Sequence, residues 1–173
     1  MRETGRLRWH SGLSFSGQSG SGGRIAWEGA DGVAGLRPSE AMLASLGACT
    51  AMDVIAILGK KRQVVDRYEV ELEAQLADRH PQAFQRIEVS HELEGPDLSV
   101  EAVRRSIELS ATRYCIINAT LSSGAVEIHH RYRVRNADGE HAAEVAVTGP
   151  LGRGIVSASA AAGAGTADSG LHG

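Results

Sequence analysis

Residues 38–58 read PSEAMLASLGACTAMDVIAIL, and this stretch decides the fold. Pro38 is favourable at the first position of a helix. From residue 41 to residue 58 the only strongly polar side chains are Ser45, Thr50 and Asp53. A helix that is apolar on every side is either a membrane span or a segment buried all round. The charge of Asp53 and the short apolar length argue against a span, so the sequence predicts a central core helix.

Three later segments alternate apolar and polar residues with the period of two that is typical of half-buried strands, namely 68–76, 86–94 and 126–134. The apolar face of such a sheet needs a cover, which we expect to be helical. A second helix is predicted from Ser99, as its N-cap, to about Cys115. Two N-terminal strands are expected at 7–15 and 24–28, joined by the glycine-rich loop 17–23.

Length and composition favour one globular domain. The 173 residues are 42% hydrophobic and 23% charged, which is enough for a sizeable core. We assign residues 1–135 to this domain and interpret the Ala-, Gly- and Ser-rich residues 136–173 as a disordered tail, in which only 143–147 could form a short strand. The fold class is α+β, and a helix this apolar suggests that a second subunit completes the core of a homodimer.

Charge and the N-terminal residues limit the expected partners and location. A net charge of -3 gives no electrostatic reason to bind nucleic acid or an anionic membrane. The first ten residues have no apolar run of signal-peptide length, so we expect a cytoplasmic protein. In a reducing cytoplasm, two cysteines are usually buried residues, reactive thiols or metal ligands, and two alone make a poor zinc site. The histidines form no ligand grouping, and no metal site is expected.

The two cysteines lie in the segments that matter most. Cys49 is in the middle of the predicted core helix, and Cys115 follows SATRY at the end of the second helix. The simplest interpretation is that both are ordinary core residues, since free cysteine is among the most buried residue types. The alternative is that they form a reactive pair.

The sequence PSEAMLASLGAC at 38–49 resembles the helix of the OsmC/Ohr family, which begins with proline and carries the peroxidatic cysteine at this distance. The sequence YCII at 114–117 resembles the second cysteine motif of that family. The resemblance covers roughly residues 5–134 and implies antiparallel sheets wrapped around a long central helix in an intertwined dimer. It also implies a thiol peroxidase: Cys49 attacks an organic hydroperoxide, becomes a sulfenic acid and is captured by Cys115 as a disulfide.

By the same resemblance, no cofactor is bound, and the disulfide is reduced by an external dithiol of the dihydrolipoyl type, carried by a lipoylated protein. The nucleophile must be a thiolate at neutral pH, and Cys49 lies too far from the start of its helix for much help from the helix dipole. In the family an arginine stabilises the thiolate, and a glutamate directly after the proline holds that arginine. Arg24 and Arg37 are the candidates for the arginine here, with Arg24 the better match.

The chain departs from the family pattern at the glutamate. Ser39 follows the proline, and the acid comes one position later as Glu40, nine residues before Cys49 and so on roughly the opposite helix face. This Pro-x-Glu form resembles a less characterised OsmC-like branch. Asp53 lies one turn after Cys49 on the same face, where a carboxylate would raise a thiol pKa unless it holds a cation. We interpret Asp53 as a hydrogen-bonding group at the dimer interface.

Apolar neighbours suggest the substrate. The expected pocket around the cysteines is lined by Leu46, Met52, Tyr114 and Ile116, which suits an organic hydroperoxide better than hydrogen peroxide. The sequence therefore predicts a peroxidase of oxidative-stress defence. The alternative is a dimer of the same fold that senses redox state or binds an apolar ligand without efficient turnover.

Overall fold

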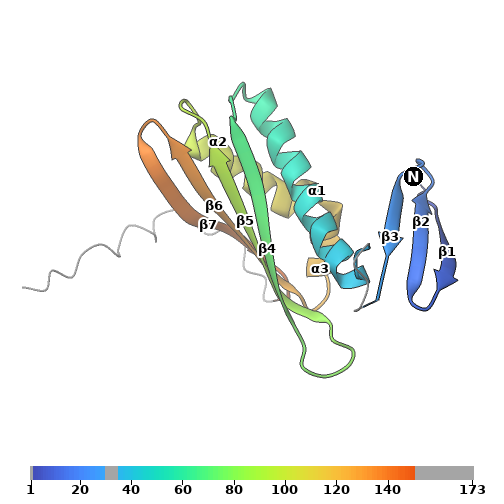
Figure 1. The fold of residues 1–173 in the computed structure, drawn as a ribbon. Coiled ribbons are helices and arrows are strands. Elements are labelled where there is room, and N and C mark those ends of the chain that lie inside the picture. Colours follow the sequence, from blue (N-terminus) through green and yellow to red (C-terminus); the bar gives the residue numbers. More distant parts are fainter. Residues whose placement is uncertain (1, 30–34, 151–173) are drawn as a thin grey trace, which may run out of the picture. The chain divides into compact units, whose positions relative to one another are not determined.

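The computed structural model describes residues 2–29 and 35–150. The chain divides into two compact units, with the boundary between Ser45 and Leu46 inside helix α1. The elements in chain order are β1 (Gly5–Ser11), β2 (Ser14–Ser19), β3 (Arg24–Trp27), α1 (Pro38–Lys60), β4 (Arg67–Leu76), β5 (Phe84–Glu94), α2 (Val100–Leu109), the π-helical turn η1 (Ser110–Tyr114), α3 (Ile116–Ser122), β6 (Glu127–Asn136) and β7 (Gly139–Thr148). Figure 1 labels the strands and the α-helices.

The first unit contains an antiparallel sheet in the order β1-β2-β3. The prediction of one strand over 7–15 is wrong, because Gly12 takes a left-handed conformation (φ 48°) and turns the chain between β1 and β2. The predicted loop 17–23 is also too long, since its first three residues belong to β2 and pair with β3 or β1. The strand expected at 24–28 is confirmed as β3.

Helix α1 begins at Pro38, as predicted. The carbonyl oxygen of Arg37 accepts from the N–H of Ala41 at 3.0 Å, and the Glu40 carboxylate accepts from the N–H of Arg37 at 2.9 Å. Glu40 therefore satisfies a backbone donor at the helix start, as the acidic member of a capping box does. Beyond the helix end, Arg62 has a positive φ of 58°.

The second unit contains a four-stranded sheet in the order β4-β5-β6-β7. The strands predicted at 68–76, 86–94 and 126–134 are confirmed as β4, β5 and β6. The β4–β5 and β6–β7 pairs are antiparallel, whereas β5 and β6 are parallel, because α2, η1 and α3 carry the chain back to the start of the sheet between them. The α+β fold class is confirmed.

The disorder predicted for residues 136–173 is wrong for Gly139–Thr148, which form β7 at the sheet edge. Val145, Ala146 and Val147 of this strand are buried. Small residues can form a strand here because the neighbouring strand β6 and helix α2 supply the apolar surface that they lack. The rest of the predicted tail, from residue 151 on, lies outside the described residues.

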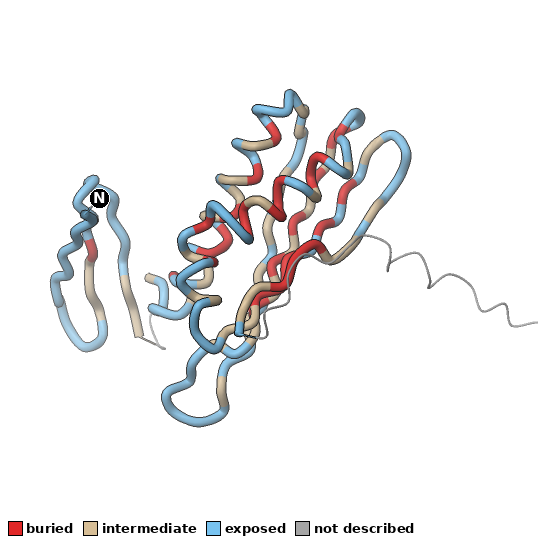
Figure 2. The backbone as a smooth tube through the Cα atoms, turned by 180° about the vertical axis from the view of Figure 1, so that it is seen from behind, coloured by how far each residue is buried: buried red, intermediate tan, exposed pale blue. Residues whose placement is uncertain are grey.

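The core of the second unit lies between its sheet and its helices. Val54 and Leu58 of α1 pack with Leu93 of β5 and with Val103 and Ile107 of α2. Figure 2 shows buried stretches along the strands of the four-stranded sheet and at intervals along the helices next to it. Helix α1 is long and apolar enough to cross a membrane, with a mean hydropathy of 1.9 over an 18-residue window. Only 33% of that window is buried inside the chain. A single chain therefore leaves much of α1 uncovered, and its burial on all sides by a second subunit stays a prediction.

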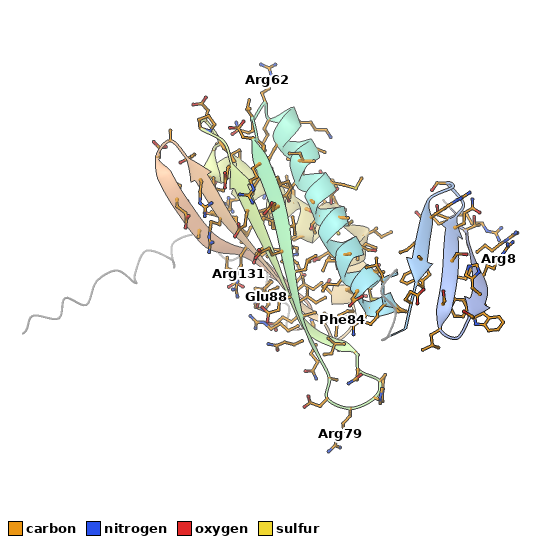
Figure 3. All side chains as sticks on the ribbon, viewed as in Figure 1. Arg8, Arg62, Arg79, Phe84, Glu88 and Arg131 are labelled. Atoms are coloured by element: carbon orange, nitrogen blue, oxygen red, sulfur yellow. The ribbon has the colours of Figure 1, made fainter. Side chains whose placement is uncertain are left out.

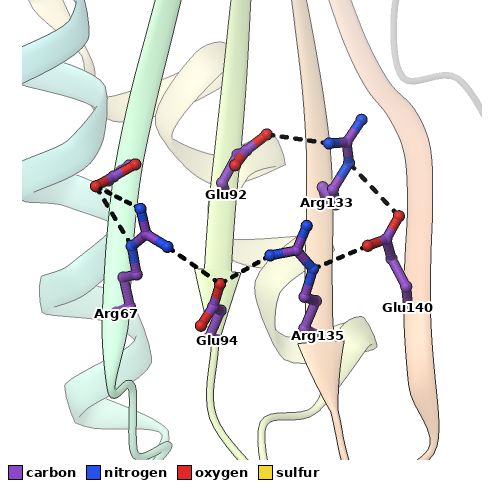
Figure 4. Close-up of polar contacts among 7 residues, drawn as sticks. Arg67, Glu92, Glu94, Arg133, Arg135 and Glu140 are labelled. Atoms are coloured by element: carbon purple, nitrogen blue, oxygen red, sulfur yellow. Dashed lines mark hydrogen bonds and ion pairs between the residues drawn. The ribbon is translucent and has the colours of Figure 1, made fainter.

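The other face of the sheet carries charges in rows. Figure 3 shows Glu88 and Arg131 on this face, where their side chains form an ion pair of 2.7 Å. In Figure 4 arginines and glutamates alternate across all four strands through Arg67, Glu94, Arg135, Glu140, Arg133 and Glu92. Such exposed pairs contribute about 0–1 kcal/mol each, so we interpret this face as a solvated surface.

Helix α2 begins as predicted, with the Ser99 hydroxyl accepting from the N–H of Ala102 at 3.2 Å. The predicted end near Cys115 is also confirmed, but its form is unusual. The last turn widens into the π-helical turn η1, and Cys115 then takes an extended conformation (φ -70°, ψ 106°) as the N-cap of α3. π-helical turns are rare and occur frequently at functional sites.

Candidate functional site

Cys49 and Cys115 come together in the second unit, together with Asp53. The two Sγ atoms and a carboxylate oxygen of Asp53 all lie within 4.8 Å of one another. Both cysteines are free thiols; Cys49 is half-buried and Cys115 is buried. Helix α1 supplies the first thiol and the carboxylate from consecutive turns of one face, and the junction between η1 and α3 supplies the second thiol.

The local backbone fixes the position of Cys115. Its N–H donates to the carbonyl oxygen of Ser110 at 3.0 Å, which closes the π-helical turn. Its Sγ accepts from the backbone N–H of Asn118 at 3.3 Å, in the way that a serine or aspartate N-cap does. The sulfur is thus held at the start of α3, only 2% exposed, and faces the α1 residues.

Asp53 is held by a hydrogen bond from the η1 turn. The hydroxyl of Ser110, which is itself buried, donates to Asp53 Oδ2 at 2.9 Å. Among the residues described from Leu46 onwards, none with a basic side chain lies within ion-pair distance of Asp53. A carboxylate without a cation opposes the formation of negative charge on the neighbouring sulfurs.

The two thiols differ in environment. Burial raises the pKa of the Cys115 thiol to about 12, and the adjacent Cys49 sulfur adds to the rise. The hydrogen bond from the backbone N–H of Asn118 lowers this pKa and offsets part of the increase. Cys115 is therefore a protonated thiol in the reduced protein at neutral pH. Cys49 is the more accessible of the two, which suits it to meet a reactant first.

A buried polar chain continues behind Cys115. His130 Nε2 lies 2.9 Å from Asn118 Oδ1, and the His91 ring stacks on His130 with 5.9 Å between centroids. His91 Nδ1 in turn contacts the hydroxyl of Tyr68 at 2.7 Å. An amide oxygen only accepts, so His130 must donate from Nε2. Burial, and then the charge of His129, lower the pKa of His130 to about 4, and burial lowers that of His91, so both rings are neutral.

Sequence reasoning missed this chain of side chains. The alternation patterns did place His91 and His130 on inward strand faces, which is the only signal that pointed to them. Their stacking follows from the parallel register of β5 and β6, which sets Val89 opposite His130 and His91 opposite Tyr132. No local sequence feature specifies that register.

The candidate activating residues lie in the first unit. Glu40 accepts from Arg37 Nε at 2.7 Å and forms an ion pair with its guanidinium, and both side chains are about half exposed. The Arg37 guanidinium lowers the pKa of the Glu40 carboxyl. Arg24 is exposed at the start of β3, opposite Gln18 of β2. Its pairing with Cys49 stays a prediction.

The four residues expected to line the pocket are placed differently from one another. Leu46 is fully buried in the core, whereas the other three are largely exposed: Met52 at 70%, Tyr114 at 53% and Ile116 at 69%. These exposed side chains come from α1, η1 and α3, the elements that carry the two cysteines.

A family model described as OsmC-like protein matches residues 29–145. The chain belongs to the OsmC family. The match includes both cysteines, helix α1 and the sheet through most of β7. Among curated relatives, Protein YhfA of Escherichia coli (strain K12) is 39% identical over 129 residues, which cover 75% of this OsmC-family chain and 96% of that protein.

Solved structures share the OsmC fold of this chain. A hypothetical protein from Aquifex aeolicus VF5 is 26% identical with a TM-score of 0.69, and the alignment covers 79% of this chain and 98% of that one. The organic hydroperoxide resistance protein OhrB of Bacillus subtilis is 17% identical with a TM-score of 0.53, covering 76% of this chain and 98% of that one. The second likeness concerns the fold alone.

Proposed function

We propose that this OsmC-family chain is a thiol-dependent peroxidase that reduces organic hydroperoxides in oxidative-stress defence. The Cys49 thiolate attacks the outer oxygen of the peroxide, the O–O bond breaks, and the alkoxide takes up a proton and leaves as the alcohol. Cys49 is then a sulfenic acid. Cys115 gives its proton to the sulfenic hydroxyl as its sulfur attacks the Cys49 sulfur, an S–S bond forms, and the hydroxyl leaves as water.

The observation that carries the proposal is the pairing of an accessible and a buried thiol within 4.8 Å. A disulfide requires an S–S bond of about 2.0 Å, so only a small movement of the Cys49 and Cys115 side chains is needed after oxidation. The protonated state of Cys115 keeps it from competing with Cys49 for peroxide, because the thiol is a poor nucleophile.

The cation that stabilises the Cys49 thiolate is proposed to be Arg24. The guanidinium of Arg37 is already paired with Glu40, whose carboxylate also accepts from the Arg37 backbone N–H at the start of α1. The exposed Met52, Tyr114 and Ile116 supply apolar surface on the elements that carry the thiols, which suits an alkyl or lipid hydroperoxide.

We also propose that the active form is a cytoplasmic homodimer. Met52 and Ile55, 70% and 43% exposed, leave an apolar face of α1 uncovered that a second subunit would bury. No bound cofactor is needed, since an external dithiol of the dihydrolipoyl type, on a lipoylated protein, reduces the disulfide by two exchange steps. Neither nucleic acid nor a membrane is a proposed partner.

The test is stopped-flow reaction of the reduced protein with cumene hydroperoxide, with the products read by intact mass. We expect wild type to form one intramolecular disulfide, Cys49→Ser to be inert and Cys115→Ser to accumulate sulfenic acid. Arg24→Gln should slow the first step, whereas Arg8→Gln, an exposed arginine on β1, serves as the matched control. A Cys49 that reacts no faster than a free thiol would contradict the proposal.

The dimer needs its own measurement. Met52→Glu places a charge on the exposed face of α1 and should shift the sedimentation coefficient towards the monomer, whereas Gln75→Glu on an exposed position of β4 should not. Equal masses for both variants and wild type at a monomer value would rule the dimer out.

One observation favours a second function. The carboxylate of Asp53 beside both sulfurs opposes thiolate formation, and Glu40 is engaged by Arg37. The alternative is a dimer of the same fold without efficient peroxidase turnover. Its thiol pair would act as a slow redox sensor, or its uncovered apolar surface would bind an apolar ligand. A disulfide that forms once with peroxide but is not reduced in repeated cycles by dihydrolipoamide supports this alternative.

A further inference from the structure

The structure brings a third ligand type to the two cysteines. The sequence alone offered only two thiols and gave no reason to expect a metal. In the folded chain, Cys49 Sγ, Cys115 Sγ and an Asp53 carboxylate oxygen lie within 4.8 Å of one another. We propose that these three groups form a Zn²⁺ site in the reduced protein, a binding function that goes beyond the proposed peroxide reduction and uses the same two sulfurs.

The donor set suits zinc. Zn²⁺ binds thiolates at about 2.3 Å and carboxylate oxygens at about 2.0–2.2 Å in tetrahedral sites. A tetrahedron with those bond lengths separates its donor atoms by roughly 3.4–3.8 Å. Donors that already lie within 4.8 Å reach this spacing by small side-chain rotations. Calcium and magnesium prefer oxygen ligands throughout, so two sulfurs select against them.

Two hydrogen bonds support the donors from outside. The Ser110 hydroxyl donates to Asp53 Oδ2, and a carboxylate that accepts this bond still has lone pairs to offer a metal. The backbone N–H of Asn118 donates to Cys115 Sγ and offsets part of the negative charge of a thiolate. Metal-binding carboxylates and thiolates are usually oriented in this way by groups that do not touch the metal. Both supporting groups belong to buried residues.

Three protein ligands leave the fourth position of zinc open. Cys49 and Asp53 are only half-buried, so water or a small ligand can complete the tetrahedron. Zinc replaces the thiol protons, which leave as the two Zn–S bonds form. The same sulfurs cannot bind zinc while joined in a disulfide, so oxidation of the pair releases the metal.

The test uses the full chain, reduced and freed of metal by chelation under anaerobic conditions. Zinc affinity is measured by competition with a chromophoric chelator. We expect one Zn²⁺ per chain, an affinity loss of about 10-fold or more in Asp53→Asn, and loss of the site in Cys49→Ser and Cys115→Ser. Glu73→Gln, which removes an exposed carboxylate from β4, is the matched control and should bind as wild type does.

X-ray absorption spectroscopy of the zinc-loaded wild type identifies the zinc ligands directly, so this test does not depend on whether a variant folds. Two sulfur neighbours at about 2.3 Å with oxygen neighbours at about 2.0 Å support the site. An oxygen- and nitrogen-only shell, or equal zinc affinity in wild type, Asp53→Asn and Cys115→Ser, overturns it. No peroxide is present in these assays, so failure of the peroxidase proposal and failure of the zinc proposal give different results.

Discussion

His130 Nε2 lies 2.9 Å from the side-chain oxygen of Asn118, and the backbone N–H of Asn118 donates to the sulfur of Cys115. The side-chain Nδ2 of Asn118 donates to the carbonyl oxygen of Ala111 at 2.8 Å and to the Thr148 hydroxyl at 3.1 Å. One buried asparagine thus ties together the turn before Cys115, strand β6 and strand β7. The Cys115 sulfur is positioned by a network that runs through the core rather than by a surface loop.

The neutral state of His130 predicts a dependence of stability on acid. Its pKa is lowered from 6.5 to about 4 by burial, so between these values the unfolded chain takes up a proton that the folded chain does not. The free energy of unfolding therefore falls as pH drops from 6.5 to 4. In His130→Gln this contribution is absent, and urea titrations should give a shallower decline. His80→Gln, at an exposed position, should follow wild type; parallel curves for all three proteins would argue against a buried neutral His130.

Cys115 predicts the opposite dependence at alkaline pH. An ordinary thiol has a pKa of about 8.5, whereas burial raises that of Cys115 to about 12. Between these values the unfolded chain loses a proton that the folded chain keeps, so the free energy of unfolding falls as pH rises. Under reducing conditions, Cys115→Ala should show a shallower alkaline decline than wild type in urea unfolding. A difference between the two proteins that does not change with pH contradicts the assignment.

The hydrogen bond from the Ser110 hydroxyl to Asp53 should contribute more to the free energy of unfolding than the bond of a buried serine to its own helix. Ser110→Ala leaves a half-buried carboxylate without its donor, at a cost of about 1.5–3 kcal/mol. Ser106→Ala is the control, because the equally buried Ser106 only donates to Ala102 of its own helix, and alanine is the better helix former. Chemical denaturation should rank Ser110→Ala as clearly less stable than Ser106→Ala. Equal losses would mean that Asp53 gains nothing from this contact.

Gly47 of α1 lies close to the side chain of Leu72 in β4. A Cβ at Gly47 would lie 2.5 Å from Cδ1 of Leu72, so Gly47→Ala forces that side chain to move. Alanine gains about 1 kcal/mol over glycine in a helix, which the displaced Leu72 offsets. In a Leu72→Ala background the gain should appear in full. Gly59→Ala, with nothing within 4 Å of its Cβ, should stabilise wild type by up to about 1 kcal/mol. Additive effects at Gly47 and Leu72 in thermal unfolding would show that the contact has no energetic weight.

Local sequence signals determined several elements directly. Pro38 set the start of α1, Ser99 set the start of α2, and the period-two patterns set β4, β5 and β6, because each depends on residues that are neighbours along the chain. The motif around Cys49 also predicted the family. What these signals could not specify was which surfaces meet.

The tertiary structure decided the rest. The strand β7 forms from a segment that looks disordered by composition, because β6 and α2 bury its small residues. The parallel register of β5 and β6 stacks His91 on His130, and the π-helical turn brings Cys115 to Cys49 and Asp53. These contacts join residues far apart in sequence, and their free energy comes from packing and desolvation that exist only once the chain is folded.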